Sequence, residues 1–202
     1  MSITHHLDPA TLMSYAAGSL APALAAVAAQ HIAMCPHCQH ELAIAERIGQ
    51  ELMVSLPAVD APPPDLKALA ERRERRSREI ATFRARLGNL AAVRWRWIGP
   101  GLQHHRLAAG GSGTLHLLKA APGAAVPAHD HAGDELTLVL EGALLEDGLR
   151  FSAGDIADHD AEDADHRPVA DAQAGCICVI GAERKVRFRG LMARLVQPYH
   201  GM

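Results

Sequence analysis

The first third of the chain repeats apolar residues with the period of an α-helix. Asp8 and Pro9 form an N-cap and first-turn pair, and the helix that they begin is expected to end near Gly18. A second amphipathic helix is predicted over about 22–34, and a third begins at the next proline and keeps its apolar period over 36–56. The sequence therefore predicts helices that each bury one apolar face.

A proline-rich segment separates these helices from a fourth. Residues 57–65, PAVDAPPPD, cannot continue a helix and are typical of a semi-rigid linker. A charged run, ERRERRSRE, follows at 71–79, and it contains acidic and basic residues four apart in the favourable order: Glu71 with Arg75 and Glu74 with Arg78. We expect a long fourth helix with a solvated charged middle rather than a nucleic-acid patch, because the glutamates dilute its positive charge.

From about residue 95 the pattern changes to short alternating runs separated by glycine-rich turns. The runs that read as strands lie at 114–119, 135–142, 175–181 and 185–190. Several short strands at close spacing indicate an antiparallel sandwich or barrel. Because the pattern changes from helical to alternating, we place the domain boundary near residues 88–94.

The chain is thus expected to be an α + β protein of two domains. A helical domain over 1–87 carries the proline-rich joint at 57–65, and an antiparallel β-barrel domain occupies 92–202. With 202 residues, of which 49 % are hydrophobic and 21 % charged, the chain is long enough to build both cores.

The N-terminus shows no signal-peptide pattern, and no stretch approaches the ~18 apolar residues of a membrane span. We therefore expect a cytoplasmic protein without membrane contact. In that reducing compartment, the four cysteines are expected to be metal ligands, reactive thiols or core residues rather than disulfides.

The sequence HIAMCPHC at 31–38 offers three metal ligands, whereas a closed structural zinc site takes four. His31 and Cys35 are four residues apart on the second helix, and the Cys-x-x-Cys spacing brings Cys38 to the same point. Thiolates combined with an imidazole select zinc over magnesium or calcium. The segment therefore predicts a zinc site in the helical domain.

The fourth zinc ligand is expected from the residues just before the first helix. Both His5 and His6 lie there, and we prefer His6 because it is closer to the Asp8 cap. His37 and His40 are expected to face solvent on the third helix.

A second cluster, HDHAGDE at 129–135, has a different character. His129 and His131 are two residues apart and face the same side of a strand, and Glu135 can converge on them after a short turn. A fourth ligand is expected from a neighbouring strand, where we prefer His166 and keep His159 as the alternative. Three imidazoles and a carboxylate suit Zn²⁺ or another divalent transition metal.

The remaining two cysteines, Cys176 and Cys178, lie two apart in the apolar run GCICVIG, so both side chains face one side of a strand. We expect them to be small buried residues of the core. A redox role is the alternative, and it would need another partner, because cysteines spaced in this way are poorly placed to form a disulfide with each other.

These motifs resemble those of known families. His129, His131, Glu135 and Gly142 resemble the first motif of the cupin superfamily of small antiparallel barrels, and HIAMCPHC resembles the motif of zinc-binding anti-sigma factors. In this order, joined by a proline-rich segment, the two resemble the ChrR-type anti-sigma factors. The resemblance extends to GCICV and the closing LVQPY, so it covers most of the chain.

The resemblance implies a regulator and not an enzyme. Members of this family bind an extracytoplasmic-function-type sigma factor through the helical zinc domain, and we expect a heterodimer with such a factor. The cupin domain is associated with the release of sigma under oxidative or photo-oxidative stress. Direct nucleic-acid binding is not expected of the β domain, because residues 130–165 contain twelve acidic side chains and a single basic one, Arg150.

Two other functions are considered. The stronger alternative is a metal-dependent cupin enzyme of the dioxygenase or isomerase type with an accessory zinc module, because three histidines and a glutamate leave open positions on an octahedral metal. No second acid–base pair stands out beside those ligands, however. A DNA-binding repressor is less favoured, because the chain lacks a basic recognition face.

Overall fold

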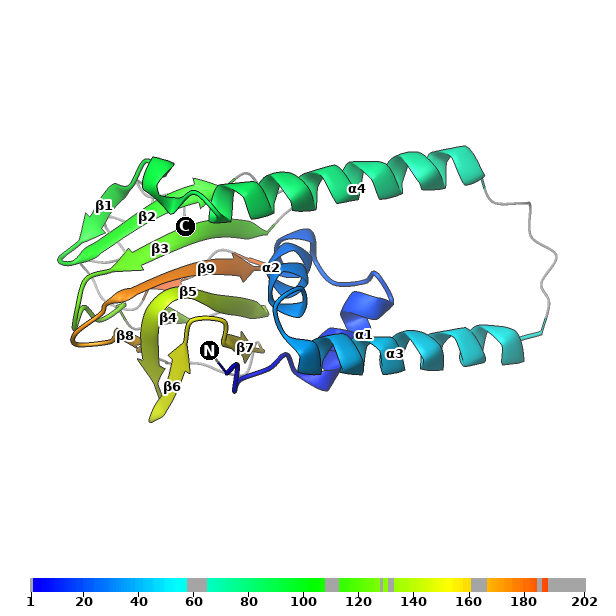
Figure 1. Ribbon diagram of the computed structural model, residues 1–202, viewed down its shortest axis with the longest axis horizontal. Helices are drawn as coiled ribbons and strands as arrows, with labels where there is room; N and C mark the ends of the chain where they lie inside the picture. Colours follow the sequence, from blue (N-terminus) through cyan, green and yellow to red (C-terminus); the bar gives the residue numbers. More distant parts are fainter. Residues whose placement is uncertain are drawn as a thin grey trace.

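The computed structural model describes residues 2–57, 65–107, 113–127, 129–130, 133–160, 167–184 and 187–188. Helices come first in this part of the chain and strands follow, as the sequence pattern predicts (Figure 1). The helices are α1 (Pro9–Ala16), α2 (Pro22–Ile32), α3 (Pro36–Ser55), α4 (Leu66–Leu87) and the short 3-10 helix η1 (Leu90–Ala92).

Local signals begin and end these helices. Asp8 caps α1 by accepting a 2.8 Å hydrogen bond from the N–H of Ala10, and Gly18, with a φ of 70°, follows its last turn. Cys35 and Asp65 cap α3 and α4 in the same way. Glu74 and Arg78 of α4 form the expected ion pair at 3.1 Å on an exposed surface.

The strands form an antiparallel, curled sheet. They are β1 (Arg96–Gly99), β2 (Leu102–Leu107), β3 (Thr114–Ala120), β4 (His129–Asp130), β5 (Glu135–Glu146), β6 (Leu149–Ser152), β7 (Ile156–His159), β8 (Val169–Ala170), β9 (Cys176–Ala182) and β10 (Arg187–Phe188). The main sheet has the order β1-β2-β3-β9-β5-β6, β7 and β8 also pair with β5, and β10 pairs with β4.

The long strand β5 contributes to both sides of the barrel. Its first half pairs with β9 and β7, and its second half pairs with β6 and β8, with a register shift between Val139 and Glu141. Gly142 sits beside this shift with a φ of 71°, and a Cβ there would collide with the carbonyl oxygen of Gly175. The strand therefore turns from one side of the barrel to the other at a position that requires glycine.

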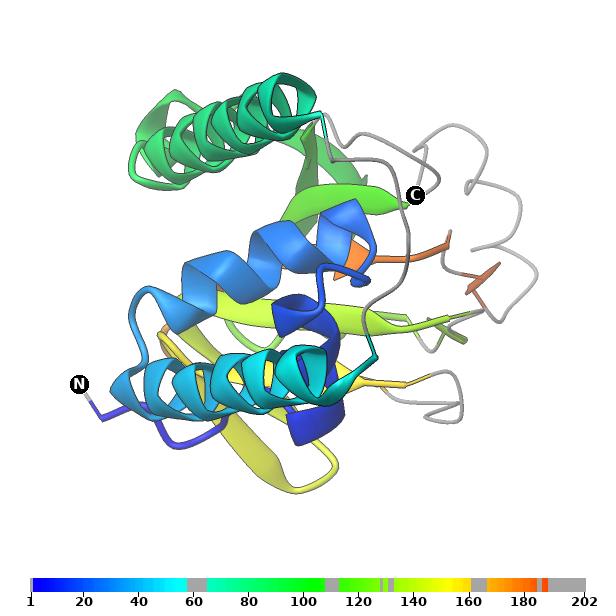
Figure 2. The same cartoon turned by 90° about the vertical axis from the view of Figure 1, so that its right-hand side faces the viewer.

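Helix α2 packs directly on the outer face of the sheet (Figures 1 and 2). The backbones come close, because a Cβ at Gly181 of β9 would lie 2.6 Å from the carbonyl oxygen of Ala23. One hydrophobic core spans the helices and the sheet, and it includes Leu24 and Val27 of α2 with Leu117, Leu138 and Val179 of the sheet. The helical domain and the barrel are therefore packed against each other.

A second core fills the barrel interior. It is built from the residues of the opposite sheet face, including Leu118, Val139, Phe151, Cys176 and Cys178. Strands β2, β3, β5, β7 and β9 thus each serve two cores, one toward the helices and one toward the barrel interior, as the alternation of side chains requires.

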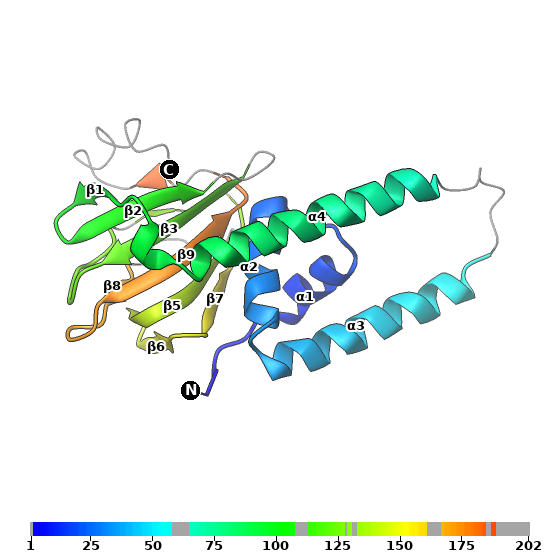
Figure 3. The ribbon, with the colours of Figure 1, turned by 45° about the horizontal axis from the view of Figure 1, so that its top comes forward.

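Helices α3 and α4 extend away from the sheet, and their outer halves lie apart from one another in all three ribbon views (Figure 3). Phe83 and Leu87 at the sheet end of α4 are buried in the shared core, whereas Leu66 at its outer end is 72 % exposed. Among the described helices, none combines the length and apolar character needed to cross a bilayer.

Candidate metal centre

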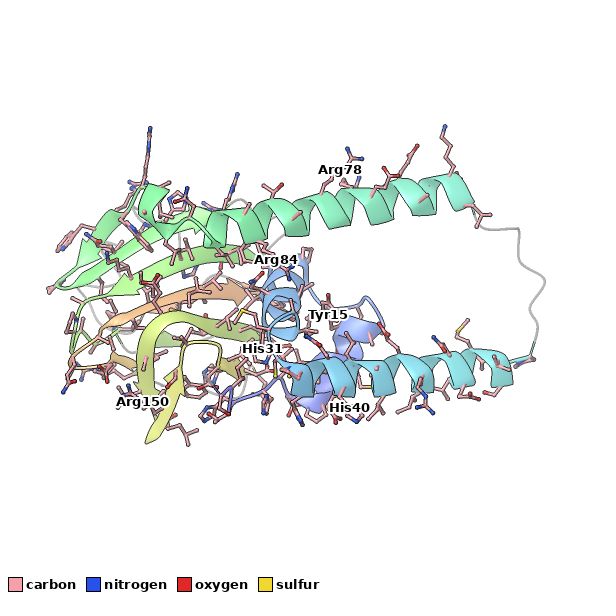
Figure 4. The ribbon with its side chains drawn as sticks, viewed as in Figure 1. Tyr15, His31, His40, Arg78, Arg84 and Arg150 are labelled. Carbon is pink, nitrogen blue, oxygen red and sulfur yellow. The ribbon has the colours of Figure 1, made fainter. Side chains whose placement is uncertain are left out.

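Four side chains converge where α2 and α3 meet the sheet, and one of them, His31, is labelled in Figure 4. The nitrogen and sulfur atoms of His6, His31, Cys35 and Cys38 all lie within 4.8 Å of one another. Nδ1 of His6 is 3.2 Å from Sγ of Cys35, and Nε2 of His31 is 3.3 Å from Sγ of Cys38. Tetrahedral zinc, with bonds of about 2.0–2.3 Å, places neighbouring ligand atoms roughly 3.3–3.8 Å apart. The donor set and its spacing therefore fit zinc.

Three separate elements bring these ligands together. His6 belongs to the extended segment before α1, His31 to the last turn of α2, and Cys38 to the first turn of α3. Helix α2 ends at Ile32, two residues earlier than predicted, so Cys35 is the N-cap of α3 rather than a helical residue. The Pro at position 36 explains this difference, because the residue before a proline is disfavoured in the α-helical conformation.

Burial changes the acidity of three ligands, and it lowers the pKa of His6 below its ordinary value. It lowers the pKa of His31 to about 4, although the hydrogen bond to Gly154 acts in the opposite direction. It also raises the pKa of the Cys38 thiol to about 11, and the nearby Cys35 contributes to this rise. The metal-free site thus holds a neutral imidazole that is ready to ligate and a thiol that gives up its proton to a metal.

The structure distinguishes the two candidate N-terminal histidines. The ring of His6 points to the cysteines, whereas Nδ1 of His5 lies 3.5 Å from Oδ2 of Asp155. His37 and His40 are exposed on α3, as expected, although the His37 ring packs at 4.2 Å from the His6 ring. The grouping therefore contains the preferred residue, His6, and not His5.

His31 also contacts the barrel. Its Nδ1 lies 3.0 Å from the carbonyl oxygen of Gly154, in the turn between β6 and β7. A carbonyl can only accept, so Nδ1 carries the proton and the Nε2 lone pair is left facing Cys38. This tautomer is the one that a metal at the centre of the four ligands needs.

The predicted barrel site is only partly described. Glu135 is buried in β5, where it accepts a 3.4 Å hydrogen bond from the hydroxyl of Thr137, and it pairs across the strands with His159. The side chain of His129 and the whole of His131 and His166 lie outside the described residues. The barrel metal and its ligands, including the choice between His166 and His159, therefore stay predictions.

Sequence reasoning missed several polar residues inside the barrel. His104 of β2 and His116 of β3 are buried, and the strand register places both on the same face of the sheet as Glu135. Glu146 is also buried, with its Oε2 3.3 Å from Nε2 of His159. The alternation in the segments LQHHRL and TLHLLK was the available signal, because each contains a histidine among inward-facing positions.

Cys176 and Cys178 are buried in the barrel core and are not in a disulfide. A hydrogen bond with Cys176 and complete burial raise the pKa of Cys178 well above its ordinary value. The Cys178 thiol is therefore protonated at neutral pH, which agrees with a core role and disfavours reaction as a thiolate. The redox alternative for the two cysteines stays a prediction.

The fold and the site together define a cupin-like protein with a helical His₂Cys₂ metal-binding module at its N-terminus. Residues 84–185 match the family described as the ChrR cupin-like domain. The chain is 36 % identical over 211 residues to the anti-sigma-E factor ChrR of Cereibacter sphaeroides, which covers 98 % of this chain and 99 % of that protein. The chain belongs to the ChrR family.

A solved structure is similar over the same extent. The crystal structure of Rhodobacter sphaeroides SigE in complex with the anti-sigma ChrR contains a chain that superimposes with a TM-score of 0.72 at 36 % identity. The match covers 90 % of this chain and 100 % of that one. The similarity therefore includes both the helical module and the barrel.

Proposed function

We propose that this chain is an anti-sigma factor, which binds an extracytoplasmic-function-type sigma factor through its helical domain and inhibits it. Membership of the ChrR family supports this function, as does the similarity to a chain solved in complex with SigE. A sigma factor works with RNA polymerase, so we place the protein in the cytoplasm.

The observation that carries the proposal is an exposed apolar stripe along α3. Ile44, Ile48 and Leu52 are spaced four residues apart on α3 and are 38 %, 45 % and 59 % exposed, and Leu56, the C-cap residue just after the helix, is 61 % exposed. Residues with this spacing share one helix face. Large apolar side chains gathered on one exposed face mark a protein interaction site. We call these four residues the α3 stripe and assign it to sigma binding.

Helix α4 supports a charged component of the same interface. Between Leu66 and Leu87 the sequence has eight basic and three acidic residues, although the whole chain carries a net charge of −3. A basic helix and a separate exposed apolar stripe favour a partner that has both an acidic face and an apolar groove, because complementary charges steer association.

The metal gives the helical domain its binding shape in this proposal. Zinc held by His6, His31, Cys35 and Cys38 would fix the N-terminal segment, α2 and the start of α3 relative to one another. The α3 stripe begins only a few residues after Cys38, so its direction depends on that joint.

The barrel has a sensory role in the proposal. We assign Zn²⁺ or another divalent transition metal to His129, His131, Glu135 and His166, and we assign the response to oxidative or photo-oxidative stress to this domain. The enzyme alternative is not favoured, because catalysis would leave the helical metal module and the exposed α3 stripe without a function.

Binding to an extracytoplasmic-function-type sigma factor of the same organism tests the proposal. Leu52→Asp should weaken binding of the full-length protein at least tenfold, because it places a charge in the apolar interface. Leu149→Asp is the matched control: Leu149 is an exposed leucine, 52 % accessible, on β6 of the barrel. Equal binding by wild type and Leu52→Asp would remove the α3 stripe from the interface. No binding by wild-type protein would overturn the function.

A further inference from the structure

The barrel supports the metal ligands of the helical domain through β7 and the turn before it. Gly154 in this turn accepts the hydrogen bond from Nδ1 of His31. Its φ of 96° suits glycine, and a Cβ there would lie 3.0 Å from Cγ1 of Ile3 in the N-terminal segment. The turn thus fits closely against two segments that contribute metal ligands.

The next residue, Asp155, holds the segment that carries His6. Its Oδ1 accepts hydrogen bonds from the backbone N–H groups of Thr4 at 2.6 Å and His5 at 3.0 Å. Its Oδ2 accepts a 2.8 Å bond from the N–H of Ser152 in its own turn. Asp155 is 1 % exposed, so these bonds are shielded from water.

The acidity of Asp155 agrees with this role. Burial alone would raise its pKa, but the hydrogen bonds from Thr4, His5 and Ser152 together lower the pKa below its ordinary value. The side chain is therefore a carboxylate at neutral pH, and it accepts more strongly than a neutral group would.

Asp158 extends the contact along β7. Its Oδ2 accepts a 2.9 Å bond from the N–H of Asp8, and its Oδ1 accepts a 3.2 Å bond from the hydroxyl of Thr11. The neighbouring side chain, His159, points to the opposite face and meets Glu146 inside the barrel. Strand β7 therefore touches the metal module with one face and the barrel interior with the other.

We propose that Gly154 and Asp155 are positioning residues of the helical metal site, and that the barrel sets through them how tightly this site holds its metal. The proposal rests on metal binding by the four ligands, as proposed above, and does not depend on the sigma partner. Groups that orient metal ligands from outside the coordination sphere typically change metal affinity 10–100-fold when mutated.

Asp155→Asn tests the proposal in the full-length, zinc-loaded protein. An amide presents a donor in place of one carboxylate oxygen, so one of the bonded N–H groups would then face another donor. The matched control is Asp171→Asn, because Asp171 also accepts from two backbone amides, of Gln173 and Ala174, in a turn of the barrel. We expect zinc release to a competing chelator to be at least tenfold faster in Asp155→Asn and unchanged in Asp171→Asn.

Co²⁺ in place of zinc gives a second readout on the same variants. The absorption bands of the Co²⁺ protein report the arrangement of the four ligands, and we expect them to shift in Asp155→Asn and to stay unchanged in Asp171→Asn. The proposal would be overturned if Asp155→Asn released zinc at the wild-type rate and gave the wild-type Co²⁺ spectrum. An equal increase in the rate of zinc release in both variants would also overturn the proposal, because the effect would then reflect the stability of the barrel.

Amide hydrogen exchange in the wild-type protein tests the same coupling and does not depend on whether a variant folds. Coupling is reciprocal, so removing the metal should deprotect the amides of Thr4, His5 and Ser152 and leave those of Gln173 and Ala174 unchanged. No change at the first three amides would overturn the proposal. Failure of the wild-type protein to bind zinc or Co²⁺ would overturn it as well.

Discussion

Nδ1 of His31 and the carbonyl oxygen of Gly154 lie 3.0 Å apart, and this hydrogen bond joins the helical domain to the barrel. It connects a candidate metal ligand to a residue 123 positions later in the sequence. The metal site therefore lies at the interface of the two domains rather than within the helical one. A conformational change in the barrel can therefore alter metal binding, and metal binding can alter the conformation of the barrel.

Replacement of Cys35 or Cys38 by alanine should abolish metal binding and sigma binding together. The two thiolates supply half of the ligand set, and zinc binding in small modules, worth ~10–16 kcal/mol, is also folding energy. Metal content and co-purification with sigma measure both effects. His40→Ala is the control, because His40 is exposed on the same helix. A Cys38→Ala protein that lacks metal but binds sigma normally would show that the metal has no structural role in binding.

His6→Ala and His5→Ala should behave differently, although the two residues are neighbours. His6 contributes Nδ1 to the four-ligand group, whereas His5 faces Asp155. We expect His6→Ala to lose the absorption bands of tetrahedral Co²⁺ and His5→Ala to retain them. The opposite result would exchange the two ligands and contradict the geometry described above.

Metal affinity should rise with pH. Burial raises the pKa of Cys38 to about 11, so the thiol is protonated at pH 7 without metal and loses its proton when metal binds. Releasing the Cys38 proton alone makes binding about tenfold tighter for each unit of pH increase below that pKa, so a slope of at least tenfold per unit is expected. His31, with its pKa lowered to about 4 by burial, is already neutral and adds no proton above that pH. Competition with a chelator of known protonation between pH 6.5 and 8 measures the slope. A metal affinity that does not change with pH would contradict this prediction.

The sequence predicted features that depend on local spacing. His31, Cys35 and Cys38 are close in the chain, so the short joint between α2 and α3 is enough to bring them together. The choice between His5 and His6 depended on which way an extended segment faces, and Asp155, which is 150 residues away from His5, decides this by holding the backbone. Such long-range bonds leave no periodic signal in the sequence.

The apolar pattern of α3 shows a second limit of sequence reasoning. Leu42 and Ala45 near its start pack inward, whereas Ile48 and Leu52 continue the same period into solvent. Periodicity predicts which face of a helix is apolar, but not whether this chain or a partner covers that face. The packing of α2 on the sheet was not predicted either, because an alanine-rich helix face suits a helix or a sheet equally well.

Leu24→Ala should destabilise both domains. Leu24 is 1 % exposed in the core that α2 shares with the sheet, so removing its side chain should cost roughly 2–5 kcal/mol of the free energy of unfolding. Leu149→Ala, on the barrel surface, should cost less than about 0.5 kcal/mol. Urea unfolding followed by tryptophan fluorescence reports the barrel, and circular dichroism reports the helices. A loss seen by circular dichroism alone would mean that the domains unfold independently.

His131→Ala should separate sensing from inhibition. His131 belongs to the proposed barrel ligands, which are distinct from the four helical ones, so we expect normal inhibition in unstressed cells and a failed response to oxidative challenge. Transcription from a sigma-dependent promoter, with and without the challenge, measures both. Full induction in His131→Ala cells would contradict the sensor role and favour the cupin enzyme alternative.

Transcription reconstituted from purified components tests the central claim most directly. RNA polymerase core and the sigma factor that this protein binds are combined on a sigma-dependent promoter, and the zinc-loaded, full-length protein is added. We predict that the wild-type protein stops transcript formation at a one-to-one ratio with sigma and that the Leu52→Asp and Cys38→Ala variants do not. Undiminished transcription in the presence of excess wild-type, zinc-loaded protein would contradict the assignment as an anti-sigma factor.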